Sequence, residues 1–433
     1  MRSRTILAGV VAVVMLAAAI AGARVRSALA VLPPGNAAQQ WDKIAENTVV
    51  GSGAFQNESL IYMAYVSNAM YRAVAPSTRG DMTRDAALIE AAYRTLSYYF
   101  PSQSATLDAL HQEALATFPD GPAKAASIRY GALAAALEIA ERHGDGLVTP
   151  LGSTSPFPTL PPGPGVWRLT PSAYLAPQTP WVGAVRPFIL RDARQFLPPP
   201  PPALSSKTWV DAFNEIKVHG SSMNPDTTET SVAKFWTANV VRQYNQLARD
   251  VATAKGMGVV QSARLFAMVN TVGADAQISC MYAKYHYLFW RPVTAIDPSS
   301  VTNDGFGPSP GFSDGNPATI EQPGWRPLIT TPNHPEYPAA HGSITSAEAQ
   351  VFSDVLGTGA IDLDIHGFDP AGSAGNLNAV RHFATAADLR TEIVNARVWG
   401  GVHYRFSGEA GVNLGQEVAN YDLAHAFPGN GFK

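Results

Sequence analysis

The hydrophobic pattern of the chain is helical over most of its length. In the first half, apolar residues recur at helical spacing with few breakers, which predicts several helices joined by short connections. The expected ranges are 59–74, 85–100, 104–118 and 122–143. Helices of this length with short connections favour an antiparallel bundle.

A long proline-rich segment interrupts this pattern. It contains PPGPG at 161–165 and five consecutive prolines at 198–202, neither of which continues a helix. Aromatic residues are scattered through it, Trp167 and Trp181 among them. Because a free linker rarely carries so many aromatics, we expect an ordered strap packed against the helices.

The helical pattern resumes after this strap. The expected helices cover 207–218, 228–255, 260–290, 343–356, 376–406 and 409–427. The fifth of them has a break near Ala386 or Gly400, and a stretch rich in Gly, Pro, Asn and Asp predicts a loop over 297–337. No strand-rich region or short repeat is recognisable, so the fold class is predicted to be all-α. The expected segments are a bundle over 31–150, the strap over 151–205 and a second bundle over 206–433.

The first thirty residues predict export. Arg2 and Arg4 form a basic start, an apolar run extends over 6–23, and the sequence ALA at 28–30 is typical of a signal-peptide cleavage site. We therefore expect cleavage near Ala30. An uncleaved membrane anchor is the alternative, because an apolar run of this length is just able to span a bilayer. The remaining sequence contains no segment of that kind.

Composition narrows the possible function classes. Hydrophobic residues make up 46% of the chain and charged residues 15%, which favours a compact globular protein over a disordered one. The formal net charge is −3, so no basic field favours nucleic acid. Cys280 is the single cysteine, which excludes an intramolecular disulfide, and its apolar neighbours predict a buried side chain rather than a reactive thiol.

Three short blocks in the second half carry charged and titratable residues in an unusual combination. The first, KYHYLFWRP, contains Lys284 and Arg291, whose separation of seven should point both side chains the same way on one helix. The second, PEYPAAHGS, contains His341 at an expected helix start, where backbone N–H groups favour anions. The third, ARVWGGVHYRF, contains Arg397 and His403 on either side of two glycines.

These five residues suit a compact oxyanion such as phosphate or vanadate. Guanidinium and ammonium groups donate charge-assisted hydrogen bonds to its oxygens. One imidazole can attack or coordinate the central atom, and the other can move a proton. Each block alone also has an ordinary interpretation, as solvated cations, a capping histidine or a kinked helix with a surface arginine. The apolar, aromatic context of the first block favours the binding site, because buried cations need anionic partners.

Taken in order, the three blocks resemble the signature of the vanadium-dependent haloperoxidases and the related type 2 phosphatidic acid phosphatases. That signature runs K-x6-R-P, then P-S-G-H, then S-R-x5-H-x3-D, and the first block matches it fully. In the second block Ala339 and Ala340 replace Ser and Gly, and in the third Ala396 and Ser407 replace Ser and Asp. The likeness extends over residues 180–427.

The resemblance implies two helical bundles, with vanadate held at the end of the second. By position, His403 would be its covalent ligand, and His341 the acid–base group on the apical side. The groups around its oxygens would be Lys284, Arg291, Arg397 and the backbone N–H groups of Ala340 and His341. In this family vanadium stays oxidised and acts as a Lewis acid on hydrogen peroxide, with a halide or a small organic acceptor as the other substrate.

The departures from the signature keep alternatives open. Ala339 lacks a hydroxyl donor, a loss that can cost about 3 kcal/mol in transition-state stabilisation. Ser407 lacks a carboxylate that could steady His403, and Glu409 is a candidate substitute. A weak or silent homologue is therefore one alternative. The other is a phosphatase that uses the same five residues, with His403 as phosphoryl acceptor and without vanadate.

Three features favour the peroxidase over the phosphatase. The chain is long, whereas soluble phosphatases of this kind are short and the lipid phosphatases span the membrane repeatedly. The sequence FWRPVTAI is the haloperoxidase-like form of the first block. Finally, His334 occupies the position where bromoperoxidases of the family carry histidine and the fungal chloroperoxidase carries phenylalanine. Bromide or iodide is therefore expected over chloride.

Two further possibilities receive less support. Asp362, Asp364 and His366 lie close together in DLDIHGFDP, but their spacing lacks the further ligands of a calcium loop. A non-enzymatic helical scaffold would require that the two imidazoles and the three cations do not converge. The sequence does not determine the oligomeric state.

Overall fold

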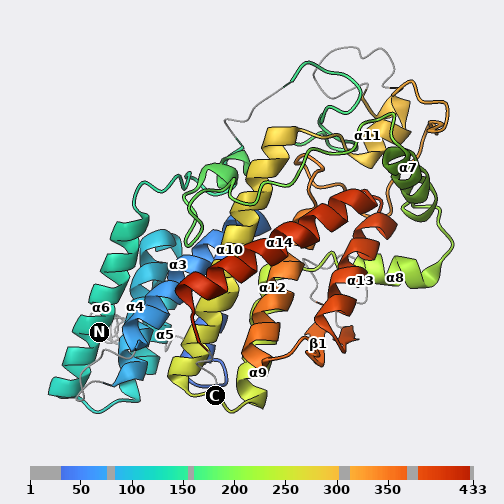
Figure 1. Cartoon of the computed structure of the whole chain (residues 1–433). Helices are drawn as coiled ribbons and strands as arrows, with labels where there is room; N and C mark the ends of the chain where they lie inside the picture. Colours follow the sequence, from blue (N-terminus) through green and yellow to red (C-terminus); the bar gives the residue numbers. More distant parts are fainter. Residues whose placement is uncertain (1–30, 76–82, 155–159, 302–312, 368–378, 430–433) are drawn as a thin grey trace, which may run out of the picture.

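The computed structural model of the chain describes residues 31–75, 83–154, 160–301, 313–367 and 379–429, so the expected signal segment lies outside it. The fold is all-α apart from one pair of short strands, as predicted (Figure 1). The helices are α2 (Ala37–Gly51), α3 (Gln56–Val74), α4 (Arg84–Tyr99), α5 (Ser104–Ala116), α6 (Pro122–Arg142), α7 (Lys207–His219), α8 (Thr227–Phe235), α9 (Val240–Ala254), α10 (Val259–Tyr287), α11 (Pro292–Ile296), α12 (Ala340–Leu356), α13 (Ala386–Trp399) and α14 (Arg405–Ala426). The 3-10 helices are η1 (Pro101–Gln103), η2 (Pro180–Ala184) and η3 (Pro298–Val301), and the strands are β1 (Leu363–His366) and β2 (Val380–Phe383).

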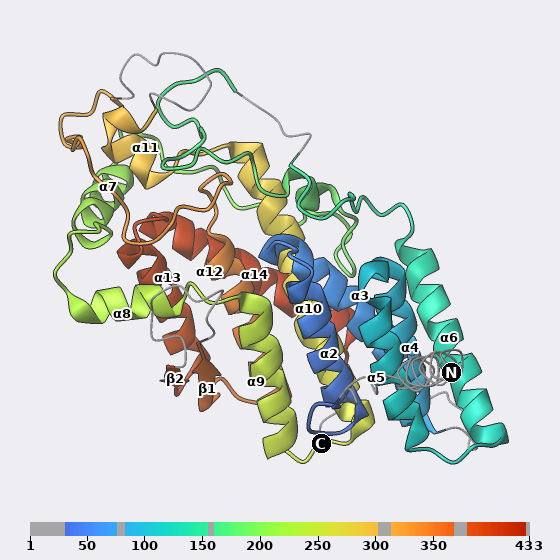
Figure 2. The same cartoon turned by 180° about the vertical axis from the view of Figure 1, so that it is seen from behind.

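The long helix α10 lies between two groups of helices (Figures 1 and 2). On one side it packs against α2 and α3, which join α4 and α6. On the other side it packs against α9, α12 and α14, and α13 packs on α12 and α14. Its sequence explains this position, because α10 is apolar or small on every side and is buried almost continuously from Ser262 to Tyr285. Cys280 lies in this stretch and is buried, as predicted.

The proline-rich strap is ordered where the structure describes it, and it crosses the end of α10 (Figure 1). Asp275 of α10 accepts hydrogen bonds from the backbone N–H groups of residues 188–190, at 2.7 to 3.1 Å. Further along, the hydroxyl of Tyr337 donates to the carbonyl of Pro199 at 2.7 Å. Trp181 is buried in the main hydrophobic core. The strap is therefore held by both polar and apolar contacts.

The end of α10 differs from the prediction. The helix ends at Tyr287, and Leu288 adopts a left-handed conformation with φ of 49°. Pro292 explains part of this, because its ring would clash with the Leu288 carbonyl in a continued helix. The strap explains the rest, since its backbone pairs with residues 288–290 through bonds of 2.7 and 3.0 Å. Arg291 becomes the residue that precedes α11, so it does not share a helix with Lys284.

Two other predicted ranges need correction, and one helix is not predicted. The helix expected over 228–255 is two helices, because the side chain of Asn239 accepts bonds from the first N–H groups of α9 and starts a new helix. The helix expected over 376–406 is β2, α13 and α14, although a break near Gly400 is present. The apolar pattern does not predict α2, whose start is fixed by a capping box between Asn36 and Gln39.

Of the acidic residues in the segment DLDIHGFDP, Asp362 directly precedes β1 and Asp364 lies within it. Asp364 faces His382 across this antiparallel pair, and the two side chains lie 2.9 Å apart. Among the described residues, no group of three or more His, Cys, Asp or Glu side chains is arranged to hold a metal ion. None of the described helices is both long and apolar enough to cross a membrane.

Candidate oxyanion site

The three sequence blocks meet at one end of the second group of helices. Lys284 lies in the last turn of α10, and Arg291 directly precedes α11. His341 lies in the first turn of α12, Arg397 in the last turn of α13, and His403 in the loop before α14. Four of the five are almost completely buried, with exposures of 0 to 2%, and His341 is mostly buried. Three cations therefore lie in a water-poor environment.

Arg291 connects several parts of this site. Its Nε donates to the carbonyl of His334 at 2.9 Å, and its Nη1 donates to the carbonyl of Val402 at 2.8 Å. Nη1 also lies 3.2 Å from Nε2 of His403, and Nη2 lies 3.0 Å from Nδ1 of His334. A guanidinium group can only donate, so both of these ring nitrogens are acceptors. The halide-site candidate His334 is thus in direct contact with Arg291.

Lys284 is held by backbone carbonyls rather than by a carboxylate. Its Nζ donates to the carbonyls of Pro335 and Glu336, both at 2.9 Å. Burial, together with the nearby cations Arg291 and Arg397, lowers the pKa of Lys284 to about 7 against the opposing effects of Cys280 and Glu336. A bound anion would favour the charged ammonium again.

His341 and Arg397 each have a buried polar atom with no hydrogen-bond partner in the described part of the chain. These atoms are Nε2 of His341 and Nε of Arg397. The other side of the Arg397 guanidinium is used, because Nη1 donates to the carbonyl of Trp236 at 3.1 Å. An unsatisfied buried polar group costs about 1–3 kcal/mol. The residues present therefore fit an oxyanion, which could accept hydrogen bonds from both.

The imidazoles of the site favour their neutral forms. Burial lowers the pKa of His403 well below its usual value, and Arg291 and Lys284 lower it further. Burial likewise lowers the pKa of His341, with Arg397 as the next largest cause. Neutral imidazoles keep a lone pair, which a ligand, a nucleophile or a general base requires.

Glu336 is a residue of the site that the sequence blocks do not identify. Its Oε1 accepts hydrogen bonds from Nδ1 of His403 at 2.9 Å and from the backbone N–H of Tyr404 at 3.0 Å. The side chain is completely buried, and burial raises the pKa of Glu336 to about 7. The expected substitute, Glu409, is instead exposed on α14. The signal in the sequence is slight, because Glu336 is one charged residue between prolines in the second block.

Glycines allow the close packing around these residues. Gly401 has φ of +75°, and a Cβ there would lie 2.2 Å from the carbonyl oxygen of Gly220. A Cβ on Gly411 would lie 2.4 Å from the carbonyl oxygen of Ala339, so α14 can approach the start of α12 only without a side chain. Gly401 thus packs directly against the backbone of Gly220. Its positive φ turns the chain between Arg397 and His403.

The part of the chain that carries this site is similar to known proteins. Residues 264–427, which contain all three blocks, match the family described as the VCPO second helical-bundle domain. Vanadium chloroperoxidase of Curvularia inaequalis is 26% identical over 292 residues, which cover 53% of this chain and 46% of the fungal protein. The chain thus aligns with about half the length of that relative. A structure described as the first bacterial vanadium-dependent iodoperoxidase superposes with a TM-score of 0.71.

The chain has the fold of the vanadium haloperoxidases, and its residues 264–427 resemble their second helical-bundle domain. The iodoperoxidase is 21% identical, and the match covers 91% of this chain and 98% of that structure. A holo-type bacterial vanadium-dependent chloroperoxidase has a TM-score of 0.65 and 19% identity, over 86% of this chain and 91% of that structure. Similarity to solved structures at these identities shows the fold alone.

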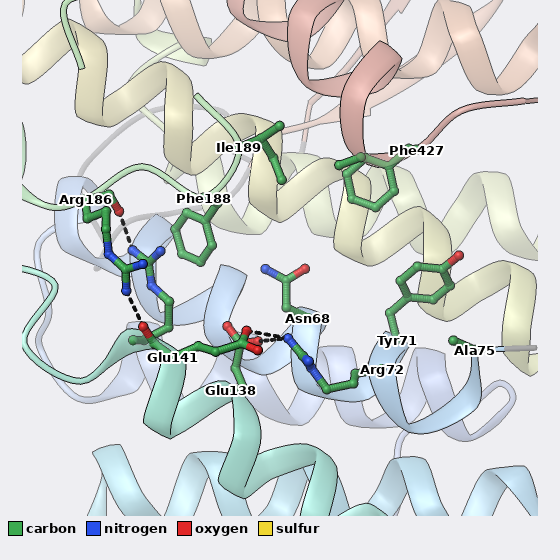
Figure 3. A pocket seen from close by; sticks show the side chains of 12 residues that line it. Asn68, Tyr71, Arg72, Ala75, Glu138, Glu141, Arg186, Phe188, Ile189 and Phe427 are labelled. Atoms are coloured by element: carbon green, nitrogen blue, oxygen red, sulfur yellow. Dashed lines mark hydrogen bonds and ion pairs between the residues drawn. The ribbon is translucent and has the colours of Figure 1, made fainter. Parts of the chain in front are cut away.

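A hollow elsewhere in the molecule has a different character (Figure 3). It lies between α3, α6, the strap and the end of α14, and none of the residues singled out by the haloperoxidase resemblance lines it. Its charged groups pair with one another, since Arg72 lies 2.6 Å from Glu141 and 3.5 Å from Glu138. Arg186 donates to the backbone carbonyl of Glu141. This hollow has no concentration of unpaired cations comparable to that of the oxyanion site.

Proposed function

We propose that this protein is a vanadate-dependent haloperoxidase that oxidises bromide or iodide with hydrogen peroxide. One observation carries the proposal: three buried cations, Lys284, Arg291 and Arg397, have no ion pair with any carboxylate of the described residues. Buried cations are costly unless an anion is near. An oxyanion of two or more charges would supply that partner.

Vanadate fits this set of donors. Lys284, Arg291, Arg397 and the backbone N–H groups of Ala340 and His341 would hold its oxygens, and Nε2 of His403 would be its ligand. When bound, vanadate would supply a Lewis acid that activates hydrogen peroxide. The cations would neutralise the negative charge that grows on its oxygens as the oxidant reacts.

His341 is the proposed proton-transfer group. Its Nε2 is the buried ring atom without a partner among the described residues, and its imidazole favours the neutral form. A neutral imidazole can take a proton from hydrogen peroxide as the peroxide enters the site and return it to the leaving oxygen. His341 lies in the first turn of α12, where backbone N–H groups would bind the oxyanion.

The proposed halide preference depends on two residues. Chloride is the hardest of the three halides to oxidise, so it requires the most strongly polarised peroxide. Ala339 precedes α12 without a hydroxyl that could assist this polarisation. His334 contacts Arg291 and could tune the donors around the oxyanion. Both features favour the more easily oxidised bromide and iodide.

A halide series with purified protein tests this function. Apo-protein is titrated with orthovanadate, and peroxide-dependent oxidation of chloride, bromide and iodide is measured in the parent, in Ala339→Ser and in His334→Phe. We expect no turnover without vanadate, a preference for bromide or iodide in the parent, and a relative gain for chloride in both variants. Equal turnover of chloride and bromide by the parent would contradict the preference.

A phosphatase is the second candidate, because an unprotonated Nε2 on His403 among three cations also suits a phosphoryl acceptor. Hydrolysis of a phosphomonoester, with competitive inhibition by vanadate and no halide turnover, would assign that function. Absence of both activities, with oxyanion binding retained, would identify a silent homologue.

We also propose that the protein is exported and cleaved near Ala30. The support is the sequence pattern of a basic start, an apolar run and a small-residue cleavage site. N-terminal sequencing of the protein recovered from outside the producing cells should begin at Val31. Recovery of uncleaved chain in the membrane fraction would favour the anchor instead.

A further inference from the structure

His403 is contacted from opposite sides of its ring by groups of fixed hydrogen-bonding character. On one side, Oε1 of Glu336 lies 2.9 Å from Nδ1, and a carboxylate oxygen accepts. On the other side, Nη1 of Arg291 lies 3.2 Å from Nε2, and a guanidinium can only donate. Together these contacts assign the ring proton to Nδ1 and leave the Nε2 lone pair free of a proton.

We propose that Glu336 is a positioning residue: its carboxylate holds the proton of His403 on Nδ1 and raises the basicity of Nε2, the atom that would bind the oxyanion. This inference rests on the proposed role of His403 at the oxyanion site. A carboxylate behind a ligand histidine fixes the ring orientation and increases the basicity of the opposite nitrogen. Glu336 therefore acts through His403 and need not touch the oxyanion.

The backbone around Glu336 is fixed in a way that suits this role. The N–H of Glu336 donates to the carbonyl of Phe289 at 2.9 Å. Its carbonyl accepts from Nζ of Lys284 at 2.9 Å and from the hydroxyl of Ser407 at 3.4 Å. Both backbone groups of Glu336 are therefore bonded, and its side chain is held separately, because Oε1 also accepts from the N–H of Tyr404.

Ser407 gives this arrangement a second feature that can be tested. Its hydroxyl donates to the backbone carbonyl of Glu336, so the side chain of Ser407 on α14 lies next to the loop that carries Glu336. A carboxylate placed at 407 would enter this region from α14. Ser407 on α14 has no carboxylate, and the negative group near His403 is instead that of Glu336, in the loop before α12.

The first test observes the ring proton directly in the apo-protein. Histidine labelled with ¹⁵N is introduced, and the Nδ1 and Nε2 signals of His403 are read from long-range proton–nitrogen correlation spectra, with His403→Gln used for assignment. We expect Nδ1 to be protonated and Nε2 unprotonated in the parent. In Glu336→Ala the two tautomers should mix, and in Glu336→Gln the tautomer should remain while the Nε2 signal shifts. This readout needs no activity.

The second test measures binding of orthovanadate and of inorganic phosphate by calorimetry. We expect the Kd for orthovanadate to rise about 10- to 100-fold in Glu336→Ala, and about tenfold in Glu336→Gln, in which the hydrogen-bond acceptor remains but its charge is lost. Glu348→Gln is the matched control, because Glu348 is also a buried carboxyl but lies further along α12. Its oxyanion affinity and the His403 signals should stay as in the parent.

Rescue separates positioning from a merely structural role. In Glu336→Ala combined with Ser407→Asp, we expect the Nδ1-protonated tautomer and most of the orthovanadate affinity to return. A folded Glu336→Ala protein with parental tautomer and affinity would overturn the proposal. If that variant does not fold, Glu336→Gln decides, and unchanged His403 signals with unchanged affinity would overturn it. A parent that binds orthovanadate but oxidises no halide would refute the proposed activity while leaving this inference intact.

Discussion

Two regions of this protein that contain buried arginines differ in the partners of those arginines. Between α2 and α9, Arg249 is paired with the carboxylates of Asp42 and Glu46, and Glu46 also lies 2.6 Å from Lys43 and 3.2 Å from Arg242. Each of these cations thus has a carboxylate partner. At the oxyanion site, by contrast, the cations contact backbone carbonyls and imidazoles.

The two regions differ in whether they contain the negative charge that balances their cations. The α2–α9 cluster already contains the negative charge that its arginines need, so it is a structural ion network. The site at the end of α10 contains three cations and the single carboxylate of Glu336, which bonds to His403 rather than to a cation. Since arginine does not lose its proton in proteins, an anion from solution would balance the second region.

The largest expected effects come from the two histidines of the oxyanion site. His403→Ala should abolish orthovanadate binding and halide oxidation, because it removes the proposed ligand. His341→Ala should retain the oxyanion but lose turnover by about 100- to 10,000-fold, the usual contribution of a positioned proton-transfer group. Calorimetry with orthovanadate and a bromide oxidation assay measure the two effects. Unchanged vanadate affinity in His403→Ala would exclude its role as ligand.

The α2–α9 cluster should show the opposite response. Arg249→Met leaves Asp42 and Glu46 buried without their main cation, so the free energy of unfolding should fall by about 3–5 kcal/mol. The Kd for orthovanadate should stay the same, because this cluster lies between other helices. Urea unfolding and calorimetry measure the two quantities. The control is Arg242→Met, which removes a more exposed partner of Glu46 and should cost about 1 kcal/mol or less. A large change in orthovanadate affinity in Arg249→Met would break the distinction between the two regions.

Oxyanion binding should in turn stabilise the whole fold. At 100 times its Kd, orthovanadate or phosphate should raise the free energy of unfolding by about 2.7 kcal/mol through mass action. The gain should persist in Arg249→Met, although from a lower starting stability, and should disappear in His403→Ala for orthovanadate. Thermal unfolding with and without the anion measures it. Equal stabilisation of His403→Ala by orthovanadate would place the binding elsewhere.

The sequence predicts the chemistry of this site better than its geometry. The five basic residues are recognisable because each lies in a short block whose residue types are unusual together. The relation of Lys284 to Arg291 is predicted wrongly, because the strap and Pro292 end α10 before Arg291, and neither effect is visible in helical periodicity. Glu336 is not predicted as a partner of His403 because the contact spans 67 residues and depends on how two loops meet. Contacts of this kind are set by tertiary packing.

The smallest expected effect concerns a buried aspartate. Asp422 on α14 is completely buried, and neither of its carboxylate oxygens has a hydrogen-bond partner among the described residues. Burial, with a smaller contribution from the nearby Asp275, raises the pKa of Asp422 to about 10. Unlike an arginine, this group can remain buried without an opposite charge because it can hold its proton. The two cases differ in the chemistry of the side chain and not in the depth of burial.

The pH dependence of stability follows from this shift. An unfolded aspartate has a pKa of about 3.9, so between roughly pH 4 and 10 the folded chain holds a proton that the unfolded chain has lost. Fewer bound protons in the unfolded state mean that stability falls as pH rises, by about 1.4 kcal/mol per pH unit from this group. Asp422→Asn cannot titrate, so its stability relative to the parent should increase by that amount for each unit between pH 6 and 8. Urea unfolding at pH 6, 7 and 8 measures the difference. If the free energies of unfolding of the parent and of Asp422→Asn change in parallel with pH, Asp422 is ionised in the folded protein. A buried charge would then be stable without a partner of opposite charge, and the comparison of the two arginine regions would fail.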